Sequence, residues 1–152
     1  MAVRRAVAGD LIRVRELWEE YAHELAESRR TPWTWSWNDV APRLRNAGVF
    51  VAEVEGRPAG FVIGSRSRGD VGHVEDLYVR PAERGVGIAT TLLLALATAF
   101  RERGVVHVAL DVDAGNEAAR ALYTRLGFDL YAERFSADVA SLEERLAATL
   151  TP

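Results

Sequence analysis

The stretch HVEDLYVRPAERGVGIA, residues 73–89, decides how this chain folds and what it can hold. Its first half reads as a strand, and its second half places Gly85 and Gly87 directly before an apolar helical pattern. Glycine removes the side chain where a backbone must approach a ligand, and a helix N-terminus offers unpaired N–H groups and a positive dipole end. This order of parts predicts a pocket for a pyrophosphate-bearing ligand.

Two well-known phosphate motifs do not fit this stretch. The dinucleotide fingerprint requires a third glycine where Thr90 stands, and the P-loop requires a Gly-Lys-Ser/Thr sequence that is absent. A tight strand-to-helix turn without any ligand therefore stays open as the alternative interpretation.

A second segment, NEAARALYTRLGF at residues 116–128, reads as a helix ended by Gly127. Asn116 and Tyr123 are seven positions apart, which places them within roughly 20° of each other on a helix surface. They can offer an amide and a phenol to one ligand. Alternatively, Asn116 caps the helix and Tyr123 is a half-buried core aromatic residue.

Composition restricts the remaining possibilities. With 152 residues, 49% of them hydrophobic and 27% charged, we expect one compact domain over residues 1–152. A net charge of −3 argues against a nucleic-acid partner, and the absence of cysteine excludes disulfides, thiolate zinc sites and a cysteine nucleophile. We expect no metal, because Asp111 and Asp113 alone do not make a site. No long apolar segment suggests a membrane partner, so a cytoplasmic protein is expected.

The rest of the chain reads as a sheet-centred domain of the α+β or mixed α/β class. Helical spacing, turn residues and apolar runs predict the elements. We expect strands at residues 2–7, 49–55, 59–65, 71–79, 105–112 and 128–135, and helices at residues 11–25, 36–46, 85–103, 116–126 and 141–150.

Residues 77–81, the glycine segment 84–89 and the segment 116–128 together resemble the GNAT superfamily of acyl-CoA-dependent N-acetyltransferases. The glycine segment is similar to that family's Arg/Gln-x-x-Gly-x-Gly/Ala signature, with Ala89 in the last place. The resemblance implies a mixed, mostly antiparallel twisted sheet flanked by helices, acetyl-CoA as co-substrate and a homodimer. A C-terminal helix departs from the family, which often ends in a seventh strand.

Carried over to this chain, the resemblance also implies roles for particular residues. The backbone N–H of Leu77 would polarise the thioester carbonyl, and Tyr123 would protonate the departing thiolate. The acetyl-CoA site would consist of Leu77, Tyr78, Val79, Arg84, Gly85, Val86, Gly87, Ile88, Ala89, Thr90, Asn116, Ala119 and Tyr123.

Glu75 is the predicted general base. An amine with a pKa of about 10 must lose a proton before it attacks. Strand alternation predicts that Glu75 shares a face with His73, Leu77 and Val79, near the reacting carbonyl, while Asp76 points to the opposite face. His73 is the second candidate base, and a solvated carboxylate without a catalytic role is the alternative for Glu75.

The acceptor site is predicted from carboxylates and aromatic residues, which suit a cationic amine. The predicted acceptor-binding residues are Glu20, Trp33, Trp35 and Glu75. Packing of the tryptophans in the core or in a subunit interface is equally open. The expected function is acetyl transfer to a small-molecule primary amine by direct attack in a ternary complex. The alternatives are a protein N-terminal or lysine acetyltransferase and a non-catalytic acyl-CoA-binding module.

Overall fold

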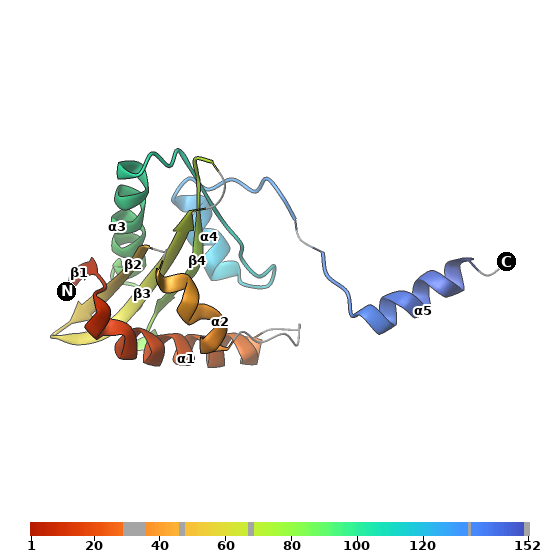
Figure 1. Ribbon diagram of the computed structural model, residues 1–152, viewed down its shortest axis with the longest axis horizontal. Coiled ribbons are helices and arrows are strands. Elements are labelled where there is room, and N and C mark those ends of the chain that lie inside the picture. The colour runs from red at the N-terminus through yellow and green to blue at the C-terminus, as the bar shows by residue number, and fades with distance from the viewer. Residues whose placement is uncertain (29–35, 46–47, 67–68, 134, 151–152) are drawn as a thin grey trace. The chain divides into compact units, whose positions relative to one another are not determined.

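The computed structural model describes residues 1–28, 36–45, 48–66, 69–133 and 135–150. The chain divides into two compact units, Met1–Asp113 and Ala114–Pro152, and each is described by itself. Figure 1 shows the elements of both units along the chain.

The first unit carries the sheet. Its strands are β1 (Ala2–Arg5), β2 (Gly48–Val54), β3 (Arg57–Arg66), β4 (Val71–Val79) and β5 (His107–Leu110). Its helices are α1 (Leu11–Ser28), α2 (Trp37–Val40) and α3 (Ile88–Glu102), with the 3-10 turns η1 (Ala8–Asp10), η2 (Ala41–Arg45) and η3 (Pro81–Glu83).

The five strands lie in the order β1-β2-β3-β4-β5, which is also their order in the chain. The first four pair antiparallel, and β5 pairs parallel with β4. A parallel neighbour needs a crossover connection, and α3 provides it between β4 and β5. The predicted mixed, mostly antiparallel sheet flanked by helices is therefore confirmed.

Helix α3 covers one face of the sheet (Figure 1). Its buried apolar side chains recur at helical spacing: Ile88, Leu92, Leu96, Ala99 and Phe100. The helix packs close to the sheet because Gly64 and Gly72 have no side chains. A Cβ at Gly64 would lie 2.5 Å from Leu96 Cδ1, and one at Gly72 would lie 2.8 Å from Phe100 Cε2.

Helices α1 and α2 cover the other face (Figure 1). Phe61 and Ile63 of β3 are fully buried there against Val14, Leu17 and Trp18 of α1. The predicted helix at residues 36–46 appears as α2 followed by η2 up to Arg45, with Pro42 inside the 3-10 part.

The second unit contains α4 (Glu117–Arg125) and α5 (Val139–Leu150), so both predicted helices are confirmed. The predicted strand at residues 128–135 is wrong: residues 128–133 and Phe135 have no strand geometry. Leu130 and Tyr131 are adjacent in this segment, and both are exposed. The segment therefore has no buried face of the kind that fixes a strand against a core. Within the described ranges, none of the helices has the length and apolar character needed to cross a bilayer.

Candidate active site

The turn between β4 and α3 is built around two glycines in the left-handed region. Gly85 has a φ of 83° and Gly87 a φ of 88°, and a Cβ at either would meet nothing within 4 Å. Gly87 is also the N-cap of α3. Positive φ favours glycine, and the first turn of a helix leaves its N–H groups without intrahelical acceptors. The turn therefore presents an exposed run of backbone suited to an anion.

The residues around the second glycine differ in how deeply their side chains are buried. The side chain of Ile88 is buried in the core beneath α3, Ala89 is partly buried, and Thr90 is exposed. Val86 is exposed as well, at 70%. Because the Ile88 side chain is buried, a ligand can contact only the backbone of this residue. This agrees with a predicted contact through backbone amides.

Arg84, the first residue of the glycine signature, points its side chain back into the protein. Its Nε donates to the carbonyl oxygen of Val79 at 2.8 Å. Its Nη2 donates to both carboxylate oxygens of Glu24, at 2.9 and 2.8 Å. The guanidinium also lies over the ring of Tyr78, 5.6 Å from the centroid. The side chain thus contacts the strand and α1.

Strand β4, which carries Glu75 and Leu77, extends beyond the end of β5. Pairing with β5 extends only from Val71 to Val74. Within the described residues, no strand pairs with this edge of β4 from Glu75 to Val79. Unpaired backbone groups on a strand edge can pair with an extended ligand. Leu77 and Val79 lie on this segment, and their side chains pack toward α3.

A β-bulge in β4 corrects the predicted alternation. Ile63 pairs with Asp76, whereas the next residue of β3, Gly64, pairs with Val74, so Glu75 is an extra residue. Because of this bulge, the side chains of Leu77 and Val79 pack toward α3, whereas His73 and Glu75 share the opposite face. The prediction that all four residues share one face is wrong.

Asp76 also differs from the prediction. Its cross-strand partner Ile63 is buried in the core beneath α1, so Asp76 lies on that face too. Glu75 and Asp76 therefore lie on the same side of the sheet. Two consecutive residues on one face are a known consequence of a bulge.

Glu75 belongs to a polar group at the bulge. The Ser65 hydroxyl donates to Glu75 Oε1. His73 Nδ1 lies 3.5 Å from the same oxygen, and His73 Nε2 lies 3.7 Å from Asp111 Oδ2. Both Glu75 and His73 have partly exposed side chains, at 27% and 28%. A carboxylate held by a hydroxyl and next to an imidazole suits proton transfer.

Glu20, a predicted acceptor residue, is bound by an arginine of the chain itself. The guanidinium of Arg80 donates to both of its carboxylate oxygens, and the shortest distance is 2.7 Å. The hydroxyl of Tyr78 lies 3.4 Å from Glu20 Oε2. The hydrogen bonds from Arg80 lower the pKa of Glu20. Burial, followed by the negative charge of Glu20, raises the pKa of Tyr78.

The tryptophan run is only partly described. Trp33 and Trp35 lie outside the described residues. Trp37 begins α2 and packs against Trp18, with ring centroids 5.9 Å apart. Trp37 therefore belongs to the core beneath α1, which was one of the two interpretations of this run.

In the second unit, Asn116 is the N-cap of α4, and its Oδ1 accepts from the backbone N–H of Ala119 at 3.1 Å. This agrees with the capping interpretation and leaves its amide nitrogen outside that bond. Tyr123 packs edge-on against Phe128, with centroids 5.6 Å apart. Burial raises the pKa of the Tyr123 phenol.

The first unit thus brings together the glycine turn, the open edge of β4 and the Glu75 group. Asn116, Ala119 and Tyr123 lie in the second unit. Ser65 and Arg80 were not predicted as site residues. Glu24 and Arg80 make contacts over 60 residues of sequence, and no local pattern indicates such pairs. Among the described residues, no three His, Cys, Asp or Glu side chains gather as metal ligands.

Curated relatives share the sequence pattern. An uncharacterised N-acetyltransferase of Methanocaldococcus jannaschii is 38% identical over 80 residues, covering 52% of this chain. The chain spans only 51% of that protein's length. A glucosamine 6-phosphate N-acetyltransferase of Trypanosoma brucei brucei is 31% identical over 111 residues, covering 66% of this chain and 74% of that protein.

Solved structures share the fold. The ribosomal-protein-S18-alanine N-acetyltransferase of Escherichia coli superposes with a TM-score of 0.71 at 26% identity, covering 86% of this chain and 79% of that one. An aminoglycoside N-acetyltransferase in complex with CoA gives a TM-score of 0.68 at 20% identity, covering 90% and 98%.

The model of the acetyltransferase (GNAT) family matches residues 13–128, a span that includes the glycine turn, the bulged strand and α4. This is most of the chain, and it contains every element in which the candidate site was found. The chain therefore belongs to the GNAT acetyltransferase family.

Proposed function

We propose that residues 1–152 act as one N-acetyltransferase domain that moves an acetyl group from acetyl-CoA to the primary amine of a small molecule. The attack is direct, within a ternary complex. The observation that carries this proposal is the position of Glu75. It sits at a bulge in β4, on the segment that extends past β5 toward the glycine turn.

The donor half follows from backbone geometry. Acetyl-CoA supplies the acetyl group as a thioester. The exposed backbone from Gly85 to Thr90 binds its pyrophosphate, and the open edge of β4 at Leu77 and Val79 pairs with its pantetheine arm. The Leu77 N–H donates to the thioester carbonyl oxygen. The wider set of proposed contacts is Tyr78, Arg84, Val86, Ile88, Ala89, Asn116, Ala119 and Tyr123.

The proton transfers balance the reaction. Glu75 takes a proton from the ammonium group of the acceptor, so that the neutral amine can form the C–N bond. As the C–S bond breaks, Tyr123 gives its phenolic proton to the thiolate. The surplus proton of the newly bonded nitrogen restores the phenol, and Glu75 releases its proton to solvent, so that the products are the amide and the CoA thiol. His73 is the alternative base, and its 3.5 Å distance to Glu75 supports a positioning role as well.

For the acceptor we propose contacts with Glu75, Glu20, Trp33 and Trp35. Glu20 is already paired with Arg80, so its charge is largely neutralised within the chain. We therefore expect Glu20→Gln to raise the KM for a cationic amine less than Glu75→Gln does. We also propose that the chain acts in the cytoplasm as a homodimer, without a nucleic-acid or membrane partner.

A second candidate acceptor is a protein N-terminus. The likeness to a ribosomal-protein-alanine N-acetyltransferase favours it. A panel containing polyamines, amino sugars, aminoglycosides and short N-terminal peptides, assayed by CoA release, separates the two. Turnover with small amines supports the first proposal. Turnover with peptides alone favours the second, and CoA binding without turnover favours a non-catalytic module.

The mechanism is tested with Glu75→Gln and Tyr123→Phe variants. With CoA affinity unchanged, each should lower kcat about 10²-fold or more, the size typical of a lost acid or base. His73→Gln is the companion variant for the base. If Glu75→Gln retains kcat/KM from about pH 6 to 9 and His73→Gln does not, the base is His73.

A further inference from the structure

We propose that Glu24 is a positioning residue for the glycine turn. By holding the guanidinium of Arg84, it fixes the backbone that presents the amides of residues 85–90. The inference rests on the proposed function, since the ligand of this turn is acetyl-CoA. It adds a residue of α1, 60 positions earlier in the chain, to the donor site.

The first step is the direction of the Arg84 side chain. Nε is bound to the Val79 carbonyl, and Nη2 is bound to both oxygens of Glu24. Both groups are therefore committed to the protein. A planar guanidinium held at two edges has a fixed orientation. Arg84 acts here as a connection between α1, the end of β4 and the turn.

The second step concerns Gly85 and Val86, the turn residues before the N-cap, because the Gly87 carbonyl already accepts from the backbone N–H and the hydroxyl of Thr91, at 3.0 and 2.9 Å. Gly85, Val86 and Gly87 are exposed, and the two glycine positions have no atoms nearby that a side chain could pack on. Glycine has more conformational freedom to lose than any other residue. Fixing the residue directly before the glycines reduces the entropy lost when the amides bind an anion.

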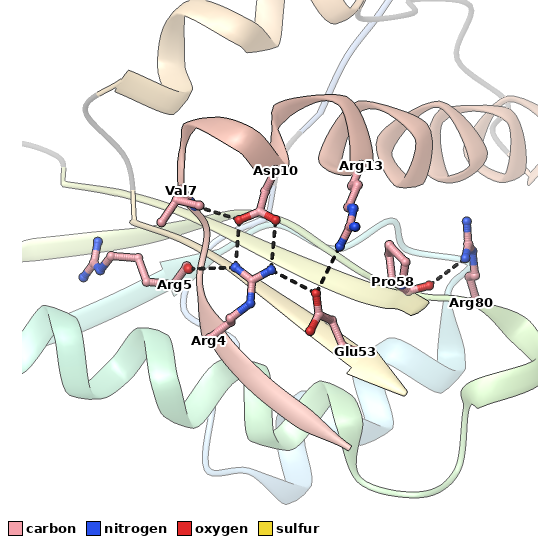
Figure 2. Close-up of polar contacts among 8 residues, drawn as sticks. All are labelled: Arg4, Arg5, Val7, Asp10, Arg13, Glu53, Pro58 and Arg80. Atoms are coloured by element: carbon pink, nitrogen blue, oxygen red, sulfur yellow. Dashed lines mark hydrogen bonds and ion pairs between the residues drawn. The ribbon is translucent and has the colours of Figure 1, made fainter. Parts of the chain in front are cut away.

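The third step is a second pair of the same kind. Glu20 lies one helical turn before Glu24, and Arg80 lies four residues before Arg84. Arg80 binds Glu20. Arg80 also donates through Nη1 to the Pro58 carbonyl at 2.6 Å (Figure 2). The connection η3, which lies between the two arginines, is thus tied to the same helix at both ends.

A contribution to the stability of the fold does not explain these two ion pairs. The side chains of Glu24 and Arg84 are 46% and 45% exposed, and ion pairs at that exposure contribute little to folding. Their geometry, with two carboxylate oxygens facing one arginine nitrogen, is specific in direction. Such a pair sets the position of the turn more than the stability of the fold.

Electrostatics and positioning predict opposite changes in CoA affinity when Glu24 is replaced, and the test uses this difference. Glu24 carries a negative charge near an anion site, so electrostatics alone predict tighter CoA binding when it is removed. Positioning predicts the opposite. We expect Glu24→Gln to weaken CoA binding, measured by calorimetry, by about fivefold to tenfold. The KM for acetyl-CoA should rise by a similar factor, while the KM for the amine and kcat stay near wild type.

Two variants control the experiment. Glu19→Gln removes the same charge from the same helix but from a pair with Arg15, and it should leave CoA binding unchanged. Glu24→Asp retains the carboxylate and should restore part of the affinity. CoA binding by Glu24→Gln that equals or exceeds wild type overturns the inference. If the wild-type chain binds no CoA, the proposed function falls instead, and the inference falls with it.

Discussion

Arg4 holds the carboxylate of Asp10 with two parallel hydrogen bonds, Nη1 to Oδ2 at 2.7 Å and Nη2 to Oδ1 at 2.9 Å (Figure 2). Asp10 also accepts from the backbone N–H of Val7 at 2.8 Å, and its side chain is only 6% exposed. Arg4 Nη2 reaches Glu53 as well, at 2.9 Å. This network joins β1 to the start of α1 and to β2.

The Asp10 network predicts a loss of stability in acid. The hydrogen bond from Arg4, then that from Val7, lowers the pKa of Asp10 to about 2 from its ordinary 3.8. A depressed pKa stabilises the fold above the unfolded value, and this contribution is lost as pH falls toward the folded value. We expect Asp10→Asn to cost about 1–2 kcal/mol at pH 7, after allowing for the partly exposed Arg4.

Urea unfolding at several pH values measures this effect. The difference between wild type and Asp10→Asn should shrink between about pH 4 and pH 2, because the wild-type carboxylate becomes protonated there. Asp70→Asn removes the same charge at an exposed turn and should change the free energy of unfolding little. A difference that stays constant down to pH 2 would show that the carboxylate charge is not the cause.

Gly60 predicts a sharp effect of one added methyl group. A Cβ at this position of β3 would lie 2.5 Å from the Tyr78 carbonyl oxygen and 3.2 Å from Val79 Cα. These are backbone atoms of β4, and they cannot move aside without shifting the strand that carries Glu75. We expect Gly60→Ala to destabilise the chain by about 1–3 kcal/mol and to lower kcat.

Gly9→Ala is the matched control for that substitution. Its Cβ would meet nothing within 4 Å, so we expect a change in the free energy of unfolding within about 0.5 kcal/mol. Thermal and urea unfolding of both variants check the pair. Equal effects at the two positions would mean that β3 and β4 tolerate a wider spacing than their contacts indicate.

Much of the fold was predictable because it depends on local spacing. The burial of Leu92, Leu96 and Phe100 in α3 follows from their helical period, and the hairpin of β2 and β3 follows from a turn with Gly56. The strand predicted at residues 128–135 does not form in the described residues of that range. Whether such a segment forms a strand depends on a partner elsewhere in the chain.

The arrangement of the candidate site could not be predicted from the sequence. Glu75 could be identified on its strand, yet the bulge that moves it away from Leu77 appears only in the pairing with β3. The pairs Glu20–Arg80 and Glu24–Arg84 could not be predicted, because each joins residues 60 positions apart. Local sequence specifies the glycine turn, and tertiary packing specifies what holds it.

Tyr123 is the proposed proton donor, and it is one of two tyrosines in the second unit. We expect Tyr123→Phe to lower kcat about 10²-fold, because the thiolate then leaves without a positioned proton donor. Tyr131, which is 87% exposed in the same unit, is the control, and Tyr131→Phe should leave kcat unchanged. Rapid-quench measurement of single turnovers distinguishes slow chemistry from slow product release. Equal rates for both variants would remove Tyr123 from the mechanism.

We expect the proposed homodimer to associate through helix α5. One face of it carries four exposed apolar residues, Val139, Leu142, Leu146 and Leu150. Glu143 and Arg145 lie on opposite flanks of this face. Two copies of α5 that pack through this face would bury its apolar side chains.

Light scattering across a range of concentrations tests this association. We expect a dimer for wild type and a monomer, or a dimer at least about 100-fold weaker, for the double variant Leu142→Glu and Leu146→Glu, because two charges would be buried at the contact. Ala148→Glu adds a charge on the opposite face of α5 and should leave the dimer intact. If the double variant still forms a dimer, the contact between copies does not lie in α5. If the wild type is a monomer, the homodimer itself is excluded.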